Sequence, residues 1–472
     1  MQGALCYLLG AISTLLSVQY MIADYLALAD SLATEIASGR LAPGDRLPPQ
    51  RDFAYLHGIA ASTASRVYTE LRRRGLVTGE VGRGTYVRSA LAQSHPALTE
   101  PSPAPLDLEL NFPLLPHQGH TIAAALHRAL RPDSIHHALK PIGATATPQA
   151  RTIASRFLAR GGWQPAADSV AFTGNGRQAI AAALAAIASP GERIGAEAVT
   201  YPALQSIATQ LGITVVPLAM DQDGVLPEAI AHYQQTAPLK GLYLQPCLHN
   251  PLGISMNPAR KQAIADLLHA TGLPAIEDAT YGFLTDDAPL AAFAPQQVIY
   301  VESFSKRIAP GLTLGIVSAP PSIAPRLHHS IRAGGWSAAG VPLAVALQMI
   351  GDGTAESISR EKRQDARDRQ AIARHCLAGL SWQADPRAYH LWLHLPPGWR
   401  AEALVETAAR HGVALLPASA FTLSNHHAPP AVRLALSAPP QDQLRAGLET
   451  LRRLMTMATD CPSGSTPSPE AQ

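Results

Sequence analysis

A lysine flanked by hydroxyl residues is the first place in this sequence where chemistry is expected. The segment Ser303–Arg307 (SFSKR) follows Val298–Val301, a β-branched and aromatic run that predicts a buried strand. Lys306 is therefore expected just past the carboxyl end of a strand, where open α/β sheets bind ligands. An amine at this place can form a Schiff base with a carbonyl cofactor, and Ser303 and Ser305 can hold a phosphate.

An ordinary exposed lysine is the simpler interpretation of any single lysine, but this chain has few lysines. The five are Lys140, Lys240, Lys261, Lys306 and Lys362, and arginine supplies nearly all other positive charge. Among the five, only Lys306 follows a strand-like run and lies among small hydroxyl residues. Its position favours the chemical interpretation.

A second candidate phosphate site lies where a strand-like run meets an alanine-rich helical stretch. Gly176 and Arg177 precede Ala179–Ala188, and glycines before a helix N-terminus expose backbone NH groups to a phosphate. Further along, Tyr201 can lie over a planar ligand, and Asn250, fixed in a proline turn, can donate to a phenolic oxygen. Each of these patterns taken alone is also explained by ordinary turn geometry.

A carboxylate completes the set. Asp278 and Tyr281 follow Pro274–Glu277, a run that predicts another buried strand. A carboxylate there can pair with a protonated ring nitrogen, the partner that pyridoxal phosphate needs to act as an electron sink. The candidates match every polar group of that cofactor: Lys306 the aldehyde, Asp278 the ring nitrogen, Asn250 and Tyr281 the O3' oxygen, and Gly176, Arg177, Ser303 and Ser305 the phosphate.

The elements that must position these residues alternate between strands and helices from about Leu108 to Met457. This alternation predicts an α/β domain around a mostly parallel sheet. The expected strands are Ser169–Phe172, Arg193–Ala196, Thr214–Pro217, Gly241–Leu244, Pro274–Glu277, Val298–Val301 and Leu314–Ser318. With the site residues above, this region resembles the fold-type I aminotransferases, which implies a C-terminal small α+β subdomain.

The resemblance bears on three further residues. Arg433, in the strand-like run Ala431–Leu436, matches the aminotransferase arginine that binds a substrate carboxylate, although an arginine on an edge strand is the plain alternative. The family commonly has a phosphate-binding arginine seven residues after the lysine, where this chain has Thr313. Either Arg307 compensates or the phosphate is held more loosely.

The first part of the chain has a different pattern. Three helical segments are expected, ending near Gly39, Leu56 and Arg74, and a glycine-rich hairpin with Arg83 at its tip follows. Six arginines lie between positions 66 and 88, against two glutamates, in a chain whose net charge is +2. A basic three-helix unit with a hairpin predicts a winged helix-turn-helix domain that binds double-stranded DNA, with a small protein-interaction bundle as the alternative.

Two motifs carry a resemblance in this region. LAPGDRLPPQRDFA at residues 41–54 and GRGTYV at residues 82–87 resemble the GntR-type winged-helix domain. That resemblance implies DNA contacts by Arg51 and Thr63, and also by Arg46, Arg66, Arg83 and Gly84. Families of this type usually have Ser-Arg-x-Thr at the start of the third helix, whereas residues 60–63 here are Ala-Ala-Ser-Thr, so the base contacts and the operator are not implied.

Taken whole, the chain resembles the MocR subfamily of GntR-type regulators, in which a winged helix is fused to an aminotransferase-like domain. The resemblance implies a pyridoxal 5'-phosphate cofactor, a homodimer, and control of genes for vitamin B6, amino acid or amine metabolism. The expected function is a DNA-binding transcriptional regulator that senses the cofactor or an amino compound through an external aldimine. The alternatives are an active aminotransferase with an attached DNA-binding domain, and a scaffold without a cofactor.

The remaining stretches divide the chain. We expect an N-terminal extension at 1–20, the winged helix at 21–88, a proline-rich linker at 89–107, the aminotransferase-like domain at 108–457 and a disordered tail at 458–472. The four cysteines have no CxxC spacing, so neither a metal site nor a disulfide framework is predicted, and a reducing cytoplasm is the simplest location. The apolar stretch Ala4–Val18 is short for a membrane span.

Overall fold

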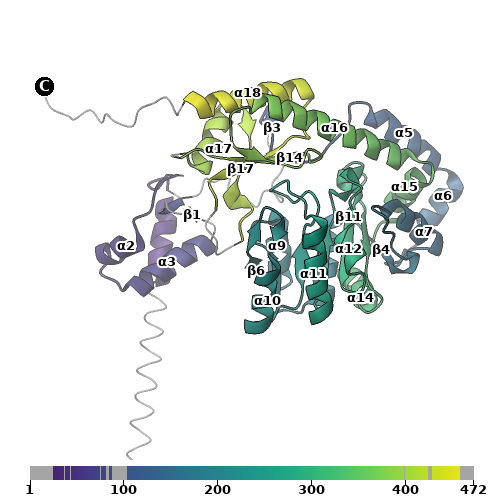
Figure 1. Cartoon of the computed structure of the whole chain (residues 1–472), viewed down its shortest axis with the longest axis horizontal. Helices are drawn as coiled ribbons and strands as arrows, with labels where there is room; N and C mark the ends of the chain where they lie inside the picture. The colour runs from purple at the N-terminus through teal and green to yellow at the C-terminus, as the bar shows by residue number, and fades with distance from the viewer. Residues whose placement is uncertain are drawn as a thin grey trace, which may run out of the picture.

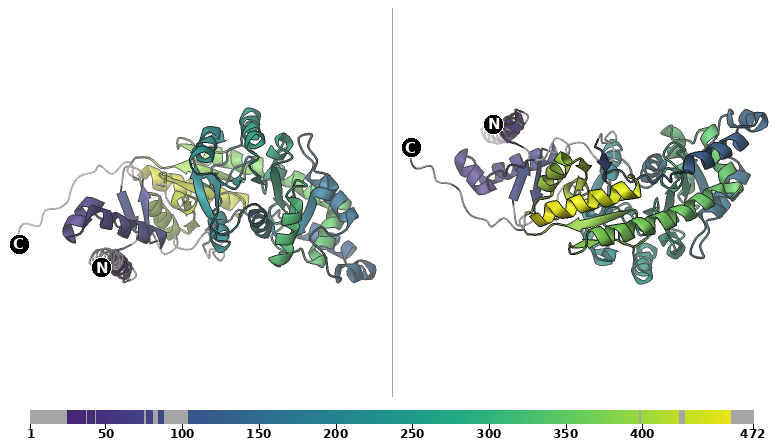
Figure 2. Two further views of the ribbon diagram at one scale, coloured as in Figure 1. Left: turned by 90° about the horizontal axis from the view of Figure 1, so that it is seen from below. Right: turned by 90° about the horizontal axis from the view of Figure 1, so that it is seen from above.

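The computed structural model describes residues 25–36, 38–42, 44–74, 76–80, 84–87, 104–397, 399–423 and 428–457. The expected extension at 1–20, most of the linker at 89–107, Arg83 and the tail at 458–472 lie outside these residues. The described parts form an elongated molecule, with a small helical domain at one end, a compact subdomain beside it and a large α/β domain beyond (Figures 1 and 2).

The N-terminal domain is a winged helix, as expected. It contains a helix over residues 25–36, then α2 (Gln50–Leu56) and α3 (Ala61–Arg73), and the antiparallel hairpin of β1 (Val77–Glu80) and β2 (Gly84–Val87). The α3 residues Ala64, Val67, Tyr68 and Leu71 recur at helical spacing and are all buried in its core. Tyr68 also donates a hydrogen bond of 2.5 Å to the carbonyl of Pro48, which fixes α3 against the turn before α2.

A seven-stranded sheet forms the centre of the large domain, and its strands coincide with the seven that the sequence predicts. In spatial order they are β4 (Val170–Thr173), β12 (Gly315–Ser318), β11 (Val298–Ser303), β10 (Ala275–Asp278), β9 (Leu242–Leu244), β5 (Arg193–Glu197) and β6 (Thr214–Leu218). Only β12 runs antiparallel to its neighbours. The carboxyl ends of the other six strands therefore meet at one edge of the sheet.

Both faces of this sheet are buried, because side chains alternate along each strand. In β11, Val298 and Tyr300 pack into one apolar cluster while Ile299 and Val301 pack into the other. One face is covered by α8 (Gly176–Ile187), α9 (Pro202–Gln210) and α14 (Ala324–Ala333). The other is covered by α5 (Gln118–Ala129), α7 (Pro148–Leu158), α10 (Pro227–Thr236), α11 (Pro258–Thr271), α12 (Leu290–Phe293) and α15 (Gly340–Gly351).

The large domain also contains several short elements. They are α6 (Pro132–Ala138), α13 (Phe304–Arg307), the 3-10 helices Ala167–Ser169 and Gly282–Leu284, and the hairpin of β7 (Met220–Asp221) with β8 (Gly224–Val225). The 23-residue helix α16 (Thr354–Cys376) then leads into the small subdomain and lies beside α18 (Gln441–Met457) (Figure 2, right).

The small subdomain has a four-stranded sheet in the order β13 (Trp382–Gln383), β14 (His390–His394), β17 (Ala431–Ala435) and β16 (Leu416–Pro417). Helix α17 (Ala401–Arg410) and β15 (Val413–Ala414) complete it. The chain enters through β3 (Leu106–Asp107), which pairs with β15. We expected these two residues at the end of the linker, but Leu106 is buried in the subdomain core, so the ordered domain begins before residue 108.

The winged helix contacts the small subdomain directly. Arg400 lies against the ring of Tyr86 and donates a hydrogen bond to the carbonyl of Gly44, and the backbone NH of Ala428 donates to the carbonyl of Gly79 over 3.1 Å. Within the described residues no helix is long and apolar enough to span a membrane, and no group of three potential metal ligands occurs.

Candidate cofactor and effector site

A cavity of about 320 Å³ lies at the edge where the carboxyl ends of the parallel strands meet. Its walls come from the residues that follow β4, β5, β9, β10 and β11, from the segment 109–112 and from the small subdomain. It brings together ten residues that the sequence singled out: Gly176, Arg177, Tyr201, Asn250, Asp278, Tyr281, Ser303, Ser305, Lys306 and Arg433. The large sheet gathers nine of them at its edge, and Arg433 comes from the small subdomain.

Lys306 lies in the short helix α13, directly after β11. Its Nζ donates a 2.6 Å hydrogen bond to the backbone carbonyl of Asn111 and lies 3.3 Å from the centre of the Phe112 ring. Burial lowers the pKa of Lys306 well below its ordinary value, and the positive charges of Arg433 and Arg177 lower it further. An amine that loses its proton easily is a nucleophile suited to an aldehyde.

Asp278 ends β10, and its carboxylate is held on two sides. Tyr243 donates to one oxygen over 2.5 Å, and the backbone NH and hydroxyl of Thr280 donate to the other. Tyr243 pairs with Ile276, two residues before Asp278, so the two side chains share a face of the sheet. The carboxylate is thereby fixed at the cavity wall, where it can accept from a ring NH of a bound ligand.

Another part of the cavity wall gathers groups that can donate hydrogen bonds to an anion. Helix α8 begins at Gly176, and a side chain there would meet Cβ of Ser303 at 3.0 Å, a tight contact that favours glycine. Ser305 shares a 3.0 Å hydrogen bond with the hydroxyl of Thr313. Arg177 donates to the Tyr201 hydroxyl over 3.2 Å. Backbone NH groups at a helix N-terminus, hydroxyls and a guanidinium are the donors that a phosphate prefers.

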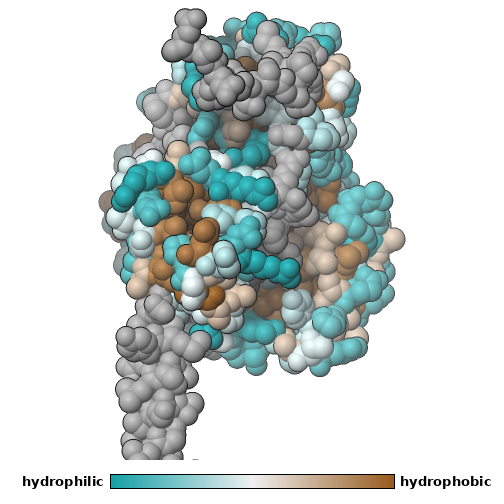
Figure 3. Space-filling view, turned by 90° about the vertical axis from the view of Figure 1, so that its left-hand side faces the viewer, coloured by the Kyte–Doolittle hydropathy of each residue, from teal (hydrophilic) through white to brown (hydrophobic). Residues whose placement is uncertain are grey.

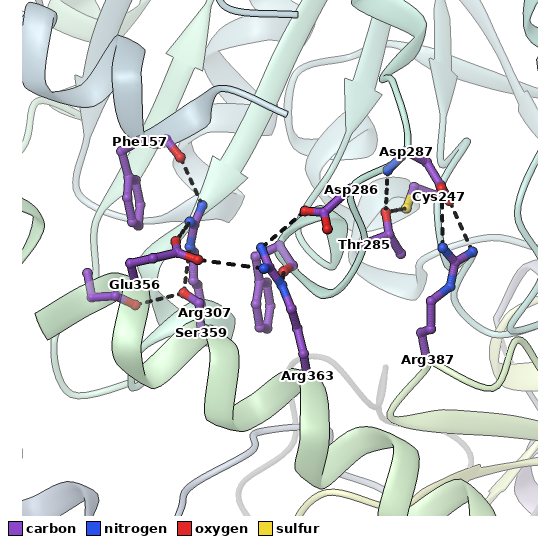
Figure 4. A network of polar contacts seen from close by, with 12 residues as sticks. Phe157, Cys247, Thr285, Asp286, Asp287, Arg307, Glu356, Ser359, Arg363 and Arg387 are labelled. Atoms are coloured by element: carbon purple, nitrogen blue, oxygen red, sulfur yellow. Dashed lines mark hydrogen bonds and ion pairs between the residues drawn. The ribbon is translucent and has the colours of Figure 1, made fainter. Parts of the chain in front are cut away.

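Arg307 does not line this cavity, so the expectation that it compensates for Thr313 loses its structural support. The guanidinium bonds to Glu302 over 2.7 Å and Ser359 over 3.0 Å, and it stacks 3.5 Å from the ring centre of Phe157. Figure 4 shows it directed at α16, within a polar network that continues through Glu356 and Arg363. These contacts hold the buried guanidinium of Arg307 away from the cavity, whereas Arg177 lines the cavity.

Arg433 enters the cavity from β17 of the small subdomain and is buried. Its Nη1 lies 3.3 Å from Oδ1 of Asn250, and its Nη2 donates to the backbone carbonyl of Glu109. Its Nε is buried without a hydrogen-bond partner in the described structure. A buried guanidinium with an unsatisfied donor can bind an incoming carboxylate.

Sequence reasoning missed several residues in and behind the cavity wall. Asn111 and Phe112 line the cavity, and Tyr243 and His390 contact residues that line it. Asn111 and Phe112 lie in an extended stretch after the linker, where no local pattern indicates chemistry. Tyr243 looks like any aromatic residue of a buried strand. His390 lies behind Tyr281, with ring centres 5.3 Å apart, and belongs to a strand that the sequence analysis did not single out.

The expected DNA-contacting residues lie apart from this cavity, in the winged helix. Arg46, Arg51 and Arg66 are exposed, whereas Thr63 is buried in the first turn of α3. Gly84 opens β2 with φ of +122°, a conformation that favours glycine, and Arg83 lies outside the described residues. Figure 3 faces this end of the molecule, where hydrophilic residues surround a group of apolar ones.

Comparisons with known proteins match both parts of the chain. A family model described as "Aminotransferase class I and II" matches residues 104–451, and one described as "Bacterial regulatory proteins, gntR family" matches residues 24–87. Among solved structures, the kynurenine aminotransferase of Pyrococcus horikoshii aligns with a TM-score of 0.70 at 22% identity, covering 79% of this chain and 96% of that one. This likeness shows the aminotransferase fold.

Two curated relatives share the whole arrangement. The uncharacterized HTH-type transcriptional regulator YdeF of Bacillus subtilis is 30% identical over 435 residues, which cover 91% of this chain and 94% of YdeF. YdcR of Escherichia coli, with the same description, is 26% identical over 433 residues, which cover 84% of this chain and 92% of YdcR. The chain therefore belongs to the class I and II aminotransferase family and, with its gntR-type domain in front, to the HTH-type transcriptional regulators of the MocR type.

Proposed function

We propose that this protein is a transcriptional regulator that binds double-stranded DNA through its winged helix and pyridoxal phosphate in the cavity. In this proposal it responds to an amino compound that joins the cofactor there. One observation carries the proposal: the small subdomain that contributes Arg433 to the cavity is also the part that contacts the winged helix through Arg400. The small subdomain thus contacts both the cavity and the DNA-binding domain.

The residues present fit pyridoxal phosphate. Gly176, at the N-terminus of α8, lines the cavity and can offer its backbone NH to a phosphate, and Asp278 offers an acceptor for the ring nitrogen. Asn250 and Tyr281 can hold the phenolic oxygen, and Lys306 can supply the amine. The cofactor, when bound, supplies an aldehyde that condenses with amines and an aromatic ring that withdraws electrons.

Binding of the effector, in this proposal, depends on Arg433. The unsatisfied Nε of Arg433 gives an α-carboxylate a donor, and its Nη groups are already anchored to Asn250 and to the segment 109–112. Arg433 also lies 5.1 Å from the Phe421 ring, on a segment bonded to the large domain through Thr200. A carboxylate bound here would draw the small and large parts together.

Coupling to DNA follows from linkage. If the effector binds two arrangements of the small subdomain unequally, it shifts their populations, and DNA affinity changes by the same coupling free energy. Leu416, in β16, lines the cavity and pairs with Arg433. Helix α17, which follows Arg400, packs against β16 as well. The path from ligand to winged helix is therefore short.

An active aminotransferase with an attached DNA-binding domain is the second candidate. The observation in its favour is that Lys306, Asp278, Asn250, Tyr281 and Arg433 all line one cavity, which is the set that such an enzyme needs. Against it stands the direct contact between the winged helix and the small subdomain.

The deciding experiment uses the full chain and a duplex that it selects from a random-sequence pool. Operator affinity is measured without cofactor, with pyridoxal phosphate, and with the cofactor plus each member of an amino acid panel. The regulator proposal expects affinity to change with cofactor or amino acid in the absence of turnover. Sustained conversion of an amino acid and a keto acid, with unchanged DNA affinity, would favour the enzyme instead.

A further inference from the structure

Asn111 connects Lys306 and Tyr281, which line the cavity, to the buried His390 behind them, although its neighbours in the sequence indicate no role. It is only 3% exposed. Its backbone carbonyl accepts from Lys306, and its side-chain Nδ2 lies 2.9 Å from the Tyr281 hydroxyl and 3.3 Å from Nδ1 of His390. The direction of these hydrogen bonds decides where the Tyr281 hydroxyl proton can go.

His390 fixes that direction. Its Nε2 lies 2.9 Å from the backbone carbonyl of His249, and because a carbonyl can only accept, Nε2 must carry the hydrogen. Burial lowers the pKa of His390 to about 4, so the ring is neutral near pH 7 and Nδ1 is an acceptor. The side-chain amide of Asn111 must then present its NH₂ group to Nδ1. The flipped amide would instead place the Oδ1 acceptor of Asn111 against Nδ1 of His390, which is also an acceptor.

The same NH₂ group faces Tyr281. One of its hydrogens bonds to His390, which leaves the other for the Tyr281 oxygen. Within the described residues the Tyr281 hydroxyl has no other hydrogen-bond partner, and Tyr281 lines the cavity. Its oxygen is thus occupied as an acceptor, and its own hydrogen is left to be donated into the cavity.

We propose that Asn111 and His390 are positioning residues that commit Tyr281 to donate its hydroxyl hydrogen to the phenolic oxygen of bound pyridoxal phosphate. This inference rests on the proposed function, because it needs the cofactor in the cavity. A committed donor stabilises the anionic form of the phenolic oxygen and so lowers the pH at which the visible absorption of the bound cofactor titrates.

The test is a pH titration of that visible absorption in the full-length protein loaded with pyridoxal phosphate. Asn111→Asp replaces the donor with an acceptor, so Tyr281 would turn its hydrogen away from the cavity. We expect the titration midpoint to rise by about one pH unit, the size that corresponds to losing one hydrogen bond. His390→Phe, which removes the acceptor that orients Asn111, should raise it in the same direction by a smaller amount.

A double-mutant cycle separates this role from a direct effect of the new charge. In a Tyr281→Phe background, Asn111→Asp should leave the midpoint where Tyr281→Phe alone has put it. His394→Phe, at the other end of β14, is the matched control and should not move the midpoint. A shift that persists in the Tyr281→Phe background, or unmoved midpoints in both Asn111→Asp and His390→Phe, would overturn the inference.

The proposed function fails in a different way. If the wild-type protein acquires no visible absorption with pyridoxal phosphate, the cofactor proposal itself is wrong. Should Asn111→Asp prove too unstable to purify, His390→Phe tests the same relationship. The dissociation constant of the cofactor, measured in each variant, checks that the altered midpoints belong to a fully loaded protein.

Discussion

The guanidinium carbon of Arg400 lies 3.7 Å from the centre of the Tyr86 ring, which joins the small subdomain to β2 of the winged helix. The same guanidinium donates to the carbonyl of Gly44, before α2. On the other side, Arg400 immediately precedes α17, whose residues pack against β15 and β16. Arg400 thus connects the DNA-binding domain to the subdomain that carries Arg433, in addition to the backbone hydrogen bond from Ala428 to Gly79.

Arg400→Ala should weaken the coupling between the two domains. Loss of the cation–π contact and the hydrogen bond removes on the order of 1–2 kcal/mol, so an effector-induced change in operator affinity should shrink by roughly 5-fold to 30-fold. The measurement is fluorescence anisotropy of a labelled operator with and without effector. Arg410→Ala, at the far end of α17, is the control. An unchanged ratio of affinities in Arg400→Ala would remove this contact from the coupling path.

Lys306→Ala should abolish the covalent attachment of pyridoxal phosphate. The cavity retains its other cofactor contacts, so weak non-covalent binding can persist while the visible absorption of the linked cofactor disappears. Borohydride reduction followed by peptide mass mapping should label Lys306 in the wild type and no residue in the variant. Labelling of another lysine, for example Lys362, would show that the assignment is wrong.

Arg433→Gln should weaken binding of amino acid effectors by roughly 10-fold to 100-fold, because hydrogen bonds to charged groups contribute about 1.5–3 kcal/mol. Calorimetric titration of the cofactor-loaded protein measures this. The amine that corresponds to the effector without its carboxylate is the matched ligand, and it should bind the wild type and the variant equally. Equal losses for both ligands would indicate a general distortion of the cavity.

Arg51→Ala should reduce operator binding and make it less dependent on salt. Loss of one phosphate contact lowers the slope of log affinity against log salt concentration by about 1. The control is Arg453→Ala, an exposed arginine on α18, far along the chain from the winged helix. Identical slopes in the wild type and Arg51→Ala would contradict the assignment of Arg51 as a DNA contact.

Lys362 makes stability depend on pH. It is fully buried, and its Nζ donates to the backbone carbonyls of Lys306 and Ile308. Burial lowers its pKa from 10.5 to about 7. Between these values the unfolded chain binds a proton that the folded chain does not, so the free energy of unfolding rises with pH, by up to about 1.4 kcal/mol per pH unit from this group.

Lys362→Met should remove that dependence. Urea unfolding at pH 7 and pH 9 is the measurement, and the wild type should gain stability relative to the variant at the higher pH. Lys140→Met, at an exposed lysine, should leave the pH dependence as it is in the wild type. Parallel pH profiles for the wild type and Lys362→Met would show that Lys362 keeps an ordinary pKa.

Much of the architecture was predictable from the sequence because it depends on local patterns. Mostly apolar runs of four or five residues marked all seven strands of the large sheet, and helical spacing of apolar residues marked α3. The strand ends also gave the candidate residues, since chemistry in a parallel sheet follows the carboxyl ends of its strands. The apolar runs are visible in the sequence because strands buried on both faces need apolar side chains at successive positions.

Contacts between distant segments were not predictable. Arg307 looked available for a phosphate because it follows Lys306, yet Glu302, Ser359 and Phe157 take its guanidinium. Asn111 carried no signal, because its partners Tyr281 and His390 lie 170 and 279 residues away. Only packing decides which side chains meet over such separations.

Lys306, just after β11, shows most clearly which features the sequence determines and which only the tertiary structure decides. Sequence by itself determined that Lys306 follows a buried strand among hydroxyl residues, and that a basic winged helix precedes its domain. The tertiary structure decided that Lys306 bonds to Asn111, that Arg433 reaches the cavity from another subdomain, and that Arg400 ties this subdomain to the winged helix. The reason is physical: local periodicity fixes which elements form, whereas side-chain partners are fixed by how those elements pack.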